Sequence, residues 1–288
     1  MAFWNIIWRA VTFVILWGFF LAALLVPLGE HLRQWEHEFP LVARLYGDVA
    51  SAVTLVAATW LMVRFIDRRP FRTIGFSTGH AIKDIVQGLA TGTLWLAVSL
   101  LVVWILGWAS PVSPAGFSWL VLLGAGISML FNVMAQELLL CGFVFQTIRT
   151  RSNAIIAVAT CAILFAGLHA GAFRGAWLPP INVCTAGILF CLAYLVTDNL
   201  WFPIAIHFSW DVLLGPVLGM TESGNAALGG SWKLFTLHGP SFPAGGEFGL
   251  EGGFVVTMST LGCIALLGAA NRAKVRAICA EARLMPAS

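Results

Sequence analysis

The sequence predicts an all-α, polytopic membrane helical bundle with about eight transmembrane helices. Of the 288 residues, 59% are hydrophobic and only 10% are charged, a charged share well below that of soluble domains. The apolar residues gather in runs of roughly 17 to 25 residues or more, the length that crosses the hydrocarbon core as a helix. Short loops rich in basic residues separate several runs. We therefore expect a single integral-membrane domain over residues 1–288.

The apolar runs can be placed in order along the chain. The first run has no basic leader and no small-residue cleavage site, so we interpret it as a retained span and not as a signal peptide. Residues 29–40 are expected to form a loop, residues 80–87 an interfacial helix, and residues 221–253 a glycine-rich loop. The fourth run exceeds a simple span, which predicts a helix that is tilted, kinked or extended past the membrane surface. The expected spans are about residues 6–28, 41–63, 88–108, 117–148, 154–170, 177–196, 200–220 and 254–270.

Basic residues in the loops predict the orientation. Eight spans put both termini on one side, and alternating loops place eleven Lys and Arg residues on that side against four on the other. The eleven are Arg64, Arg68, Arg69, Arg72, Lys83, Arg149, Arg151, Arg272, Lys274, Arg276 and Arg283, and the four are Arg33, Arg44, Arg174 and Lys233. Because cytoplasmic loops carry the excess of Lys and Arg, both termini are expected in the cytoplasm. The lipid bilayer is therefore an expected partner, and this charge pattern gives no support for nucleic-acid binding.

Polar side chains inside the apolar runs mark the candidate site. The five candidates are Gln136 and Glu137 in the fourth expected span, His169 at the end of the fifth, and His207 and Asp211 in the seventh. An ionisable group within a span is costly, so it usually faces the bundle interior and carries a function. His207 and Asp211 are four residues apart and share a helix face. A rise of about 1.5 Å per residue gives compatible depths, so we expect all five residues to line one water-accessible cavity.

A packing role is the alternative for each histidine taken alone. Several ionisable groups on three spans argue against that role for the whole set. Asp48 and Arg9 lie near span ends, where a structural or interfacial role is expected. The six cysteines contain no CxxC pair, so neither a disulfide framework nor a thiolate metal site is predicted.

The polar motifs, in this order on successive spans, resemble the CPBP family of CAAX prenyl endopeptidases and bacterial intramembrane proteases. The family pattern EExxxR, FxxxH and HxxxN corresponds here to Gln136-Glu137-xxx-Cys141, Phe165-xxx-His169 and His207-xxx-Asp211. The similarity covers about residues 64–265, including stretches around 64–76 and 245–252. The resemblance implies a multi-pass protein of a bacterial cytoplasmic membrane that acts on a peptide or protein substrate at or in the membrane.

The resemblance also implies roles for the motif residues. The first glutamate and the FxxxH histidine activate a water, and the HxxxN pair stabilises the oxyanion. A carboxylate can accept a proton from water, and preorganised donors stabilise developing negative charge. No cofactor is expected. A zinc ion held by His169, His207 and a carboxylate is the alternative. We do not favour it, because the sequence contains no HExxH spacing.

This chain departs from the family pattern at three positions. Gln136 stands where the first glutamate is expected, and an amide cannot act as a general base. Adjacent helix positions point about 100° apart, so Glu137 is no simple substitute. Cys141 stands in place of the arginine, which removes an ion pair with Glu137. Asp211 stands in place of asparagine, and because a carboxylate repels an oxyanion, its expected role is to hold His207 charged.

Two explanations of Gln136 stay open. It is an engineered change that inactivates the site, or it is the natural residue of a non-catalytic relative. We predict an intramembrane endopeptidase of the CPBP type whose activity is limited by Gln136. The alternative is a non-catalytic membrane binding or scaffold protein that retains the cavity. A transporter with a proton relay is the weakest option, because no internal symmetry is visible.

If position 136 normally carries the base, Gln136→Glu should raise cleavage of a co-expressed membrane substrate by about 10² to 10⁴. Adding His169→Ala should remove this gain, because the water loses its second partner. Equal cleavage by the unaltered chain and the Gln136→Glu variant would place the base elsewhere.

Overall fold

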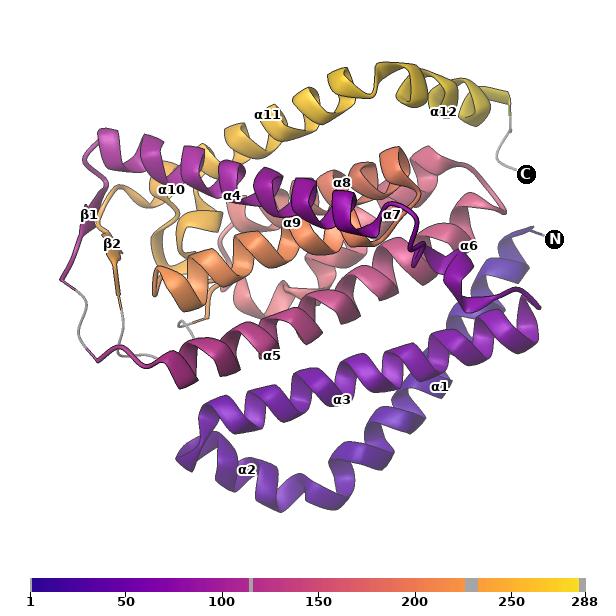
Figure 1. Cartoon of the computed structure of the whole chain (residues 1–288), viewed down its shortest axis with the longest axis horizontal. Coiled ribbons are helices and arrows are strands. Elements are labelled where there is room, and N and C mark those ends of the chain that lie inside the picture. The colour runs from indigo at the N-terminus through magenta and orange to yellow at the C-terminus, as the bar shows by residue number, and fades with distance from the viewer. Residues whose placement is uncertain (1, 114–115, 226–232, 285–288) are drawn as a thin grey trace.

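The computed structural model describes residues 2–113, 116–225 and 233–284, and it is an all-α bundle, as the sequence predicts (Figure 1). The α-helices in this part of the chain are α1 (Ala2–Leu25), α2 (Gly29–Glu38), α3 (Pro40–Leu61), α4 (Ala81–Ile105), α5 (Trp119–Glu137), α6 (Phe145–Arg149), α7 (Ala154–Leu168), α8 (Leu178–Thr197), α9 (Trp201–Val212), α10 (Ser241–Ala244), α11 (Phe254–Ala270) and α12 (Arg272–Leu284). The π-helical segments there are Met62–Ile66, Leu138–Val144 and Leu213–Val217. The 3₁₀ segments are Val26–Leu28, Phe71–Ile74, Ala170–Ala172, Gly246–Phe248 and Leu250–Gly252. Strands β1 (Ala109–Pro111) and β2 (Phe235–Leu237) pair antiparallel.

The expected count of eight transmembrane helices is not confirmed. Within the described ranges, five helical stretches are long and apolar enough to cross a membrane, and α11 with α12, bent by 93°, is a sixth candidate. The apolar helix α7 has 15 residues and α9 has 12, so both are short for a span. The five stretches are Phe3–Glu38, Pro40–Ile66, Ala81–Ile105, Trp119–Arg149 and Leu178–Thr197.

Several stretches differ from the sequence prediction, including the expected loop at residues 221–253, which contains β2, α10 and two 3₁₀ segments. Residues 29–40 are not a loop, because Gly29–Glu38 forms helix α2 after the short 3₁₀ turn Val26–Leu28. Its Glu, Gln and Arg residues are good helix formers even though the segment is too polar to be a span. The expected interfacial helix and the third span are one continuous helix, α4, because Gly88 between them packs against α9 and does not end the helix.

The irregularity predicted for the fourth span is a π-helical segment. Helix α5 ends at Glu137, the wider turns of Leu138–Val144 follow, and α6 completes the stretch to Arg149. Such segments are rare and occur frequently at functional sites. The change of helix type therefore begins directly after the polar pair that the sequence singles out.

Glycines bring α9 close to α4. A Cβ atom at Gly92 would lie 2.1 Å from Ser209 Oγ and 2.3 Å from the carbonyl oxygen of Ile206. A Cβ atom at Gly88 would lie 2.6 Å from the Cβ of Ala205. Small residues four positions apart let helices in a membrane approach closely. This contact fixes the position of the helix that carries His207 and Asp211.

The glycine-rich loop is tied to the helices by one buried asparagine on α8. Asn182 Nδ2 donates hydrogen bonds to the carbonyl oxygens of Glu251, at 2.7 Å, and Gly253, at 3.0 Å. Thr257 on α11 donates to Asn182 Oδ1 at 2.5 Å. These bonds hold the backbone around Glu251 against α8 and α11.

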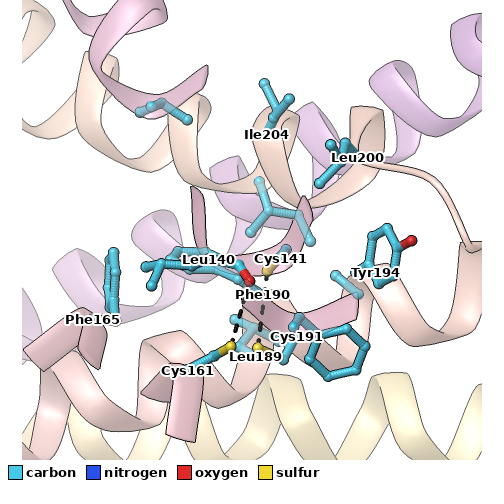
Figure 2. Packing of buried hydrophobic residues seen from close by; sticks show 14 of the residues in the cluster. Leu140, Cys141, Cys161, Phe165, Leu189, Phe190, Cys191, Tyr194, Leu200 and Ile204 are labelled. Carbon is cyan, nitrogen blue, oxygen red and sulfur yellow. Dashed lines mark hydrogen bonds between the residues drawn. The ribbon is translucent and has the colours of Figure 1, made fainter. Parts of the chain in front are cut away.

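Buried cysteines contribute to the apolar packing between the π-helical segment, α7 and α8 (Figure 2). Cys141 Sγ lies 3.9 Å from Cys191 Sγ, and Cys161 Sγ donates to the carbonyl oxygen of Leu140 at 3.4 Å. The cysteines are free thiols, so they pack as small residues with weak polar contacts.

Several loops expected on the cytoplasmic side meet at one end of the bundle, near the beginning of α1 and near α12 (Figure 1). There Asp67 pairs with Arg9 and, at 3.9 Å, with Arg151. Asp198 in the α8–α9 turn pairs with Lys274 at 2.6 Å. The arrangement is compatible with termini on one side, and their cytoplasmic location stays a prediction.

Substituting Gly92→Val should destabilise the bundle, because a side chain cannot fit between α4 and α9. Overpacking costs about 1–3 kcal/mol or more, and denaturant unfolding of the purified protein in detergent measures this change. The matched control is Gly262→Val on α11, where an added Cβ meets nothing within 4 Å. Equal destabilisation by the two substitutions would contradict the close helix contact.

Candidate active site

Four of the five sequence-predicted residues line one cavity of about 330 Å³: Gln136, His169, His207 and Asp211. Glu137 does not line this cavity, because it lies behind His207 with 1% of its surface exposed. The expectation that all five line the cavity is therefore wrong for Glu137. The 100° step between adjacent helix positions explains the difference, since it turns Gln136 toward the cavity and Glu137 into the packed interior.

His207 lies between two carboxylates. Its Nδ1 is 2.9 Å from Glu137 Oε1, and its Nε2 is 3.3 Å from Asp211 Oδ2. An imidazolium can satisfy this arrangement with two N–H donors. His207 is 5% exposed, so the three groups form a buried row that connects α5 with α9.

Aromatic rings fix the plane of the His207 ring. Phe190 stacks on it with ring centroids 4.5 Å apart at 17°, and Phe165 meets it edge-on at 5.5 Å and 80°. Both phenylalanines also line the cavity. The imidazole therefore has little freedom to rotate away from its carboxylate partners.

His169 follows the last residue of α7 and presents one nitrogen as a base. Its Nδ1 lies 2.9 Å from the carbonyl oxygen of Phe165. A carbonyl oxygen only accepts hydrogen bonds, so in the neutral ring Nδ1 carries the proton and Nε2 carries the lone pair. His169 lines the cavity with a nitrogen that can take up a proton.

Gln136 is held by a polar row that reaches α3. Its Nε2 donates to Asn132 Oδ1 at 2.5 Å, and Asn132 Nδ2 donates to Asp48 Oδ1 at 2.9 Å. Ser128 Oγ also donates to Asp48, and Arg44 Nε lies 3.7 Å from the same carboxylate. Asp48, which the sequence suggests is only structural or interfacial, is thus connected to the cavity.

Two carboxylates of the cavity, Glu222 and Glu251, were not identified from the sequence. Glu251 Oε1 accepts a hydrogen bond from Trp210 Nε1 at 2.9 Å, and Oε2 accepts one from Ser223 Oγ at 3.3 Å. A Cβ atom at Gly215 would lie 2.7 Å from Glu222 Oε2, so this carboxylate packs directly on the backbone. The available signal was the presence of acidic residues in a glycine-rich loop.

Burial perturbs both loop carboxyls, which lie outside the membrane-spanning helices. Burial, and then the negative charge of Asp211, raises the pKa of Glu251 to about 7. Burial, followed by the charges of Asp211 and Glu251, raises the pKa of Glu222 well above its ordinary value. The charged form of a carboxyl is disfavoured both by burial and by neighbouring negative charge. The cavity therefore gains negative charge as Glu251 ionises near neutral pH.

The cavity wall combines distant parts of the chain. Trp17, Arg44, Ser51 and Leu55 come from α1 and α3, and Trp95 comes from α4. Among the described residues, no three His, Cys, Asp or Glu side chains are grouped so that they could hold a metal ion. Catalysis without a metal or cofactor stays a prediction.

Comparison with known proteins gives one match. Residues 114–213 match a family model described as Rce1-like, type II CAAX prenyl endopeptidase Rce1-like. No curated protein and no solved structure matches the chain. The matched stretch contains Gln136, Glu137, His169, His207 and Asp211.

The raised pKa of Glu251 predicts that the folded state binds a proton more tightly than the unfolded chain. Protonated Glu251 therefore stabilises the folded state. This stabilisation is fully present below the ordinary carboxyl pKa and is lost as the pH rises through about 7. Glu251→Gln should therefore flatten the fall in thermal stability between pH 5 and pH 8, measured in detergent. The exposed Glu247 lies in the same loop, and Glu247→Gln is the control. Parallel pH profiles for wild type and Glu251→Gln would refute the assignment.

Proposed function

From the chain's membership of the CPBP family, supported by the Rce1-like match over residues 114–213, we propose that it hydrolyses a peptide bond of a membrane-associated substrate in this cavity. The observation that carries the proposal is the meeting of His169, His207 and Asp211 at one cavity. A proton acceptor and an oriented hydrogen-bond donor are the groups that water attack on a carbonyl requires.

His169 takes the role of general base in this proposal. Its Nδ1 is occupied by the Phe165 carbonyl, which leaves the Nε2 lone pair for a water proton. The water oxygen bonds to the substrate carbonyl carbon while the proton moves to Nε2. The C–N bond then breaks, and the leaving amine takes the proton from His169. Histidine suits both steps because its ordinary pKa lies near neutral pH.

His207 stabilises the negative charge that develops on the substrate carbonyl oxygen. Glu137 holds Nδ1 at 2.9 Å, which directs Nε2 toward Asp211 and the cavity. Asp211 keeps the ring charged and does not itself contact the oxyanion. Glu137 is thus a positioning residue, in agreement with its complete burial behind the ring.

The substrate is a peptide segment that reaches the cavity from the membrane. Aromatic side chains from five helices line the cavity: Trp17, Trp95, Phe165, Phe190 and Trp210. These rings favour apolar side chains over those of a highly charged peptide. The bilayer supplies such segments at high local concentration.

A non-catalytic binding protein is the second candidate, and Gln136 favours it. The family pattern places a carboxylate at this position, whereas the amide here lacks a group that takes up a proton. In this alternative the same cavity binds a peptide and releases it unchanged.

His169→Ala and His207→Ala should each reduce cleavage by about 10² to 10⁴, the usual contribution of general acid–base catalysis. The assay is cleavage of co-expressed, epitope-tagged single-span membrane reporters, read by the size of the tagged fragment. His31→Ala, on the exposed face of α2, is the matched control and should cleave like wild type.

Full activity of the His169→Ala variant would place the base elsewhere. If no reporter is cleaved by the wild-type chain but one co-purifies with it, the non-catalytic candidate is favoured.

A further inference from the structure

The polar row that ends at Gln136 has a defined direction of donors and acceptors. Ser128, Asn132 and Gln136 are spaced four residues apart on α5, so their side chains follow one helix face. Asp48 on α3 faces this row and is 9% exposed. The row therefore runs from a buried carboxylate on one helix to the cavity on another.

Asp48 sets the direction. Its carboxylate accepts hydrogen bonds from Ser128 Oγ and Asn132 Nδ2, and Arg44 lies 3.7 Å away. Two donors and a cation stabilise an ionised acceptor. The Asn132 amino group is therefore committed to Asp48, and only its carbonyl oxygen is left to face position 136.

A carbonyl oxygen at this point requires a donor from position 136. Gln136 supplies it through Nε2, at 2.5 Å from Asn132 Oδ1. An ionised glutamate would instead place a second acceptor against that oxygen, and an unmatched pair of acceptors at this partly buried position is costly.

We propose that Asp48 and Asn132 are positioning residues that specify an amide at position 136. Gln136 then fits the hydrogen bonds of this polar row. That fit supports Gln136 as the natural residue and not as an isolated inactivating change. The proposal also alters the expectation from sequence, because Gln136→Glu alone does not provide a well-placed base. It does not depend on the proposed function, since folding stability tests it without a substrate.

The test reverses the direction of the row. Asp48→Asn places a donor beside Asn132, whose side-chain amide can then rotate and donate to a glutamate at position 136. Wild type, Asp48→Asn, Gln136→Glu and the double variant are compared by thermal unfolding in detergent at pH 8. We expect Gln136→Glu to lower Tm by more than about 3 °C, and the double variant to recover at least half of that loss.

A third substitution distinguishes two explanations of the rescue: hydrogen bonds through Asn132, or relief of charge repulsion between positions 48 and 136. Asn132→Leu removes the relay, so Asp48→Asn should no longer rescue Gln136→Glu in that background. Gln87→Glu, on an exposed part of α4, is the control for an added carboxylate and should leave Tm unchanged.

The proposal fails if Gln136→Glu is as stable as wild type. It also fails if Asp48→Asn changes Tm equally in the wild-type and Gln136→Glu backgrounds, or if the rescue survives Asn132→Leu. Should Asp48→Asn not fold, Gln136→Met gives a second comparison: it loses one hydrogen bond without adding an acceptor, so it should lower Tm less than Gln136→Glu. A Gln136→Met variant that is as unstable as Gln136→Glu, or less stable, overturns the proposal.

Where the proposed function also holds, cleavage adds an independent readout. Gln136→Glu should raise cleavage strongly when it is combined with Asp48→Asn, and only slightly by itself. Failure of cleavage in every variant, with the Tm pattern as expected, would argue against the peptidase function and leave the directed row intact.

Discussion

The buried contact between Glu137 and His207 is the interaction on which the site depends. Either group alone in the packed interior would carry a large desolvation cost, so each requires the other. Their 2.9 Å hydrogen bond fixes α5 against α9, and the glycine contact with α4 limits movement of α9 on its other side. The position of Asp211 at the cavity follows from these two constraints.

Much of the architecture could be predicted from the sequence because long apolar runs have few alternatives in a membrane. The expected eighth span at residues 254–270 coincides with α11, and the polar motifs do meet in space. Helix α2 was missed because its residues lack the apolar run on which the assignment of spans depends. The expectation that Glu137 lines the cavity beside Gln136 was wrong, because adjacent helix positions point about 100° apart.

The remaining parts of the site depend on tertiary contacts that leave no periodic pattern. Glu222 lies between helices, and Glu251 lies in a short 3₁₀ segment. Hydrogen bonds from Asn182 and Trp210 show why the segment around Glu251 lies beside the cavity. The partnership of Asp48 with Asn132 joins residues 84 positions apart. Such a pair cannot be recognised until the crossing of α3 and α5 is known.

The cavity is formed by the stretch that matches the family model and by parts of the chain that precede and follow it. Residues 114–213, the matched stretch, carry His169 and His207. The lining residues Trp17, Arg44, Ser51 and Leu55 precede that stretch, and Glu222 and Glu251 follow it. The side chains that α1 and α3 contribute to the cavity can therefore change while the candidate site residues stay the same. Under the proposed function, substitutions in α1 and α3 would alter which peptides fit the cavity without touching His169, His207 or Asp211.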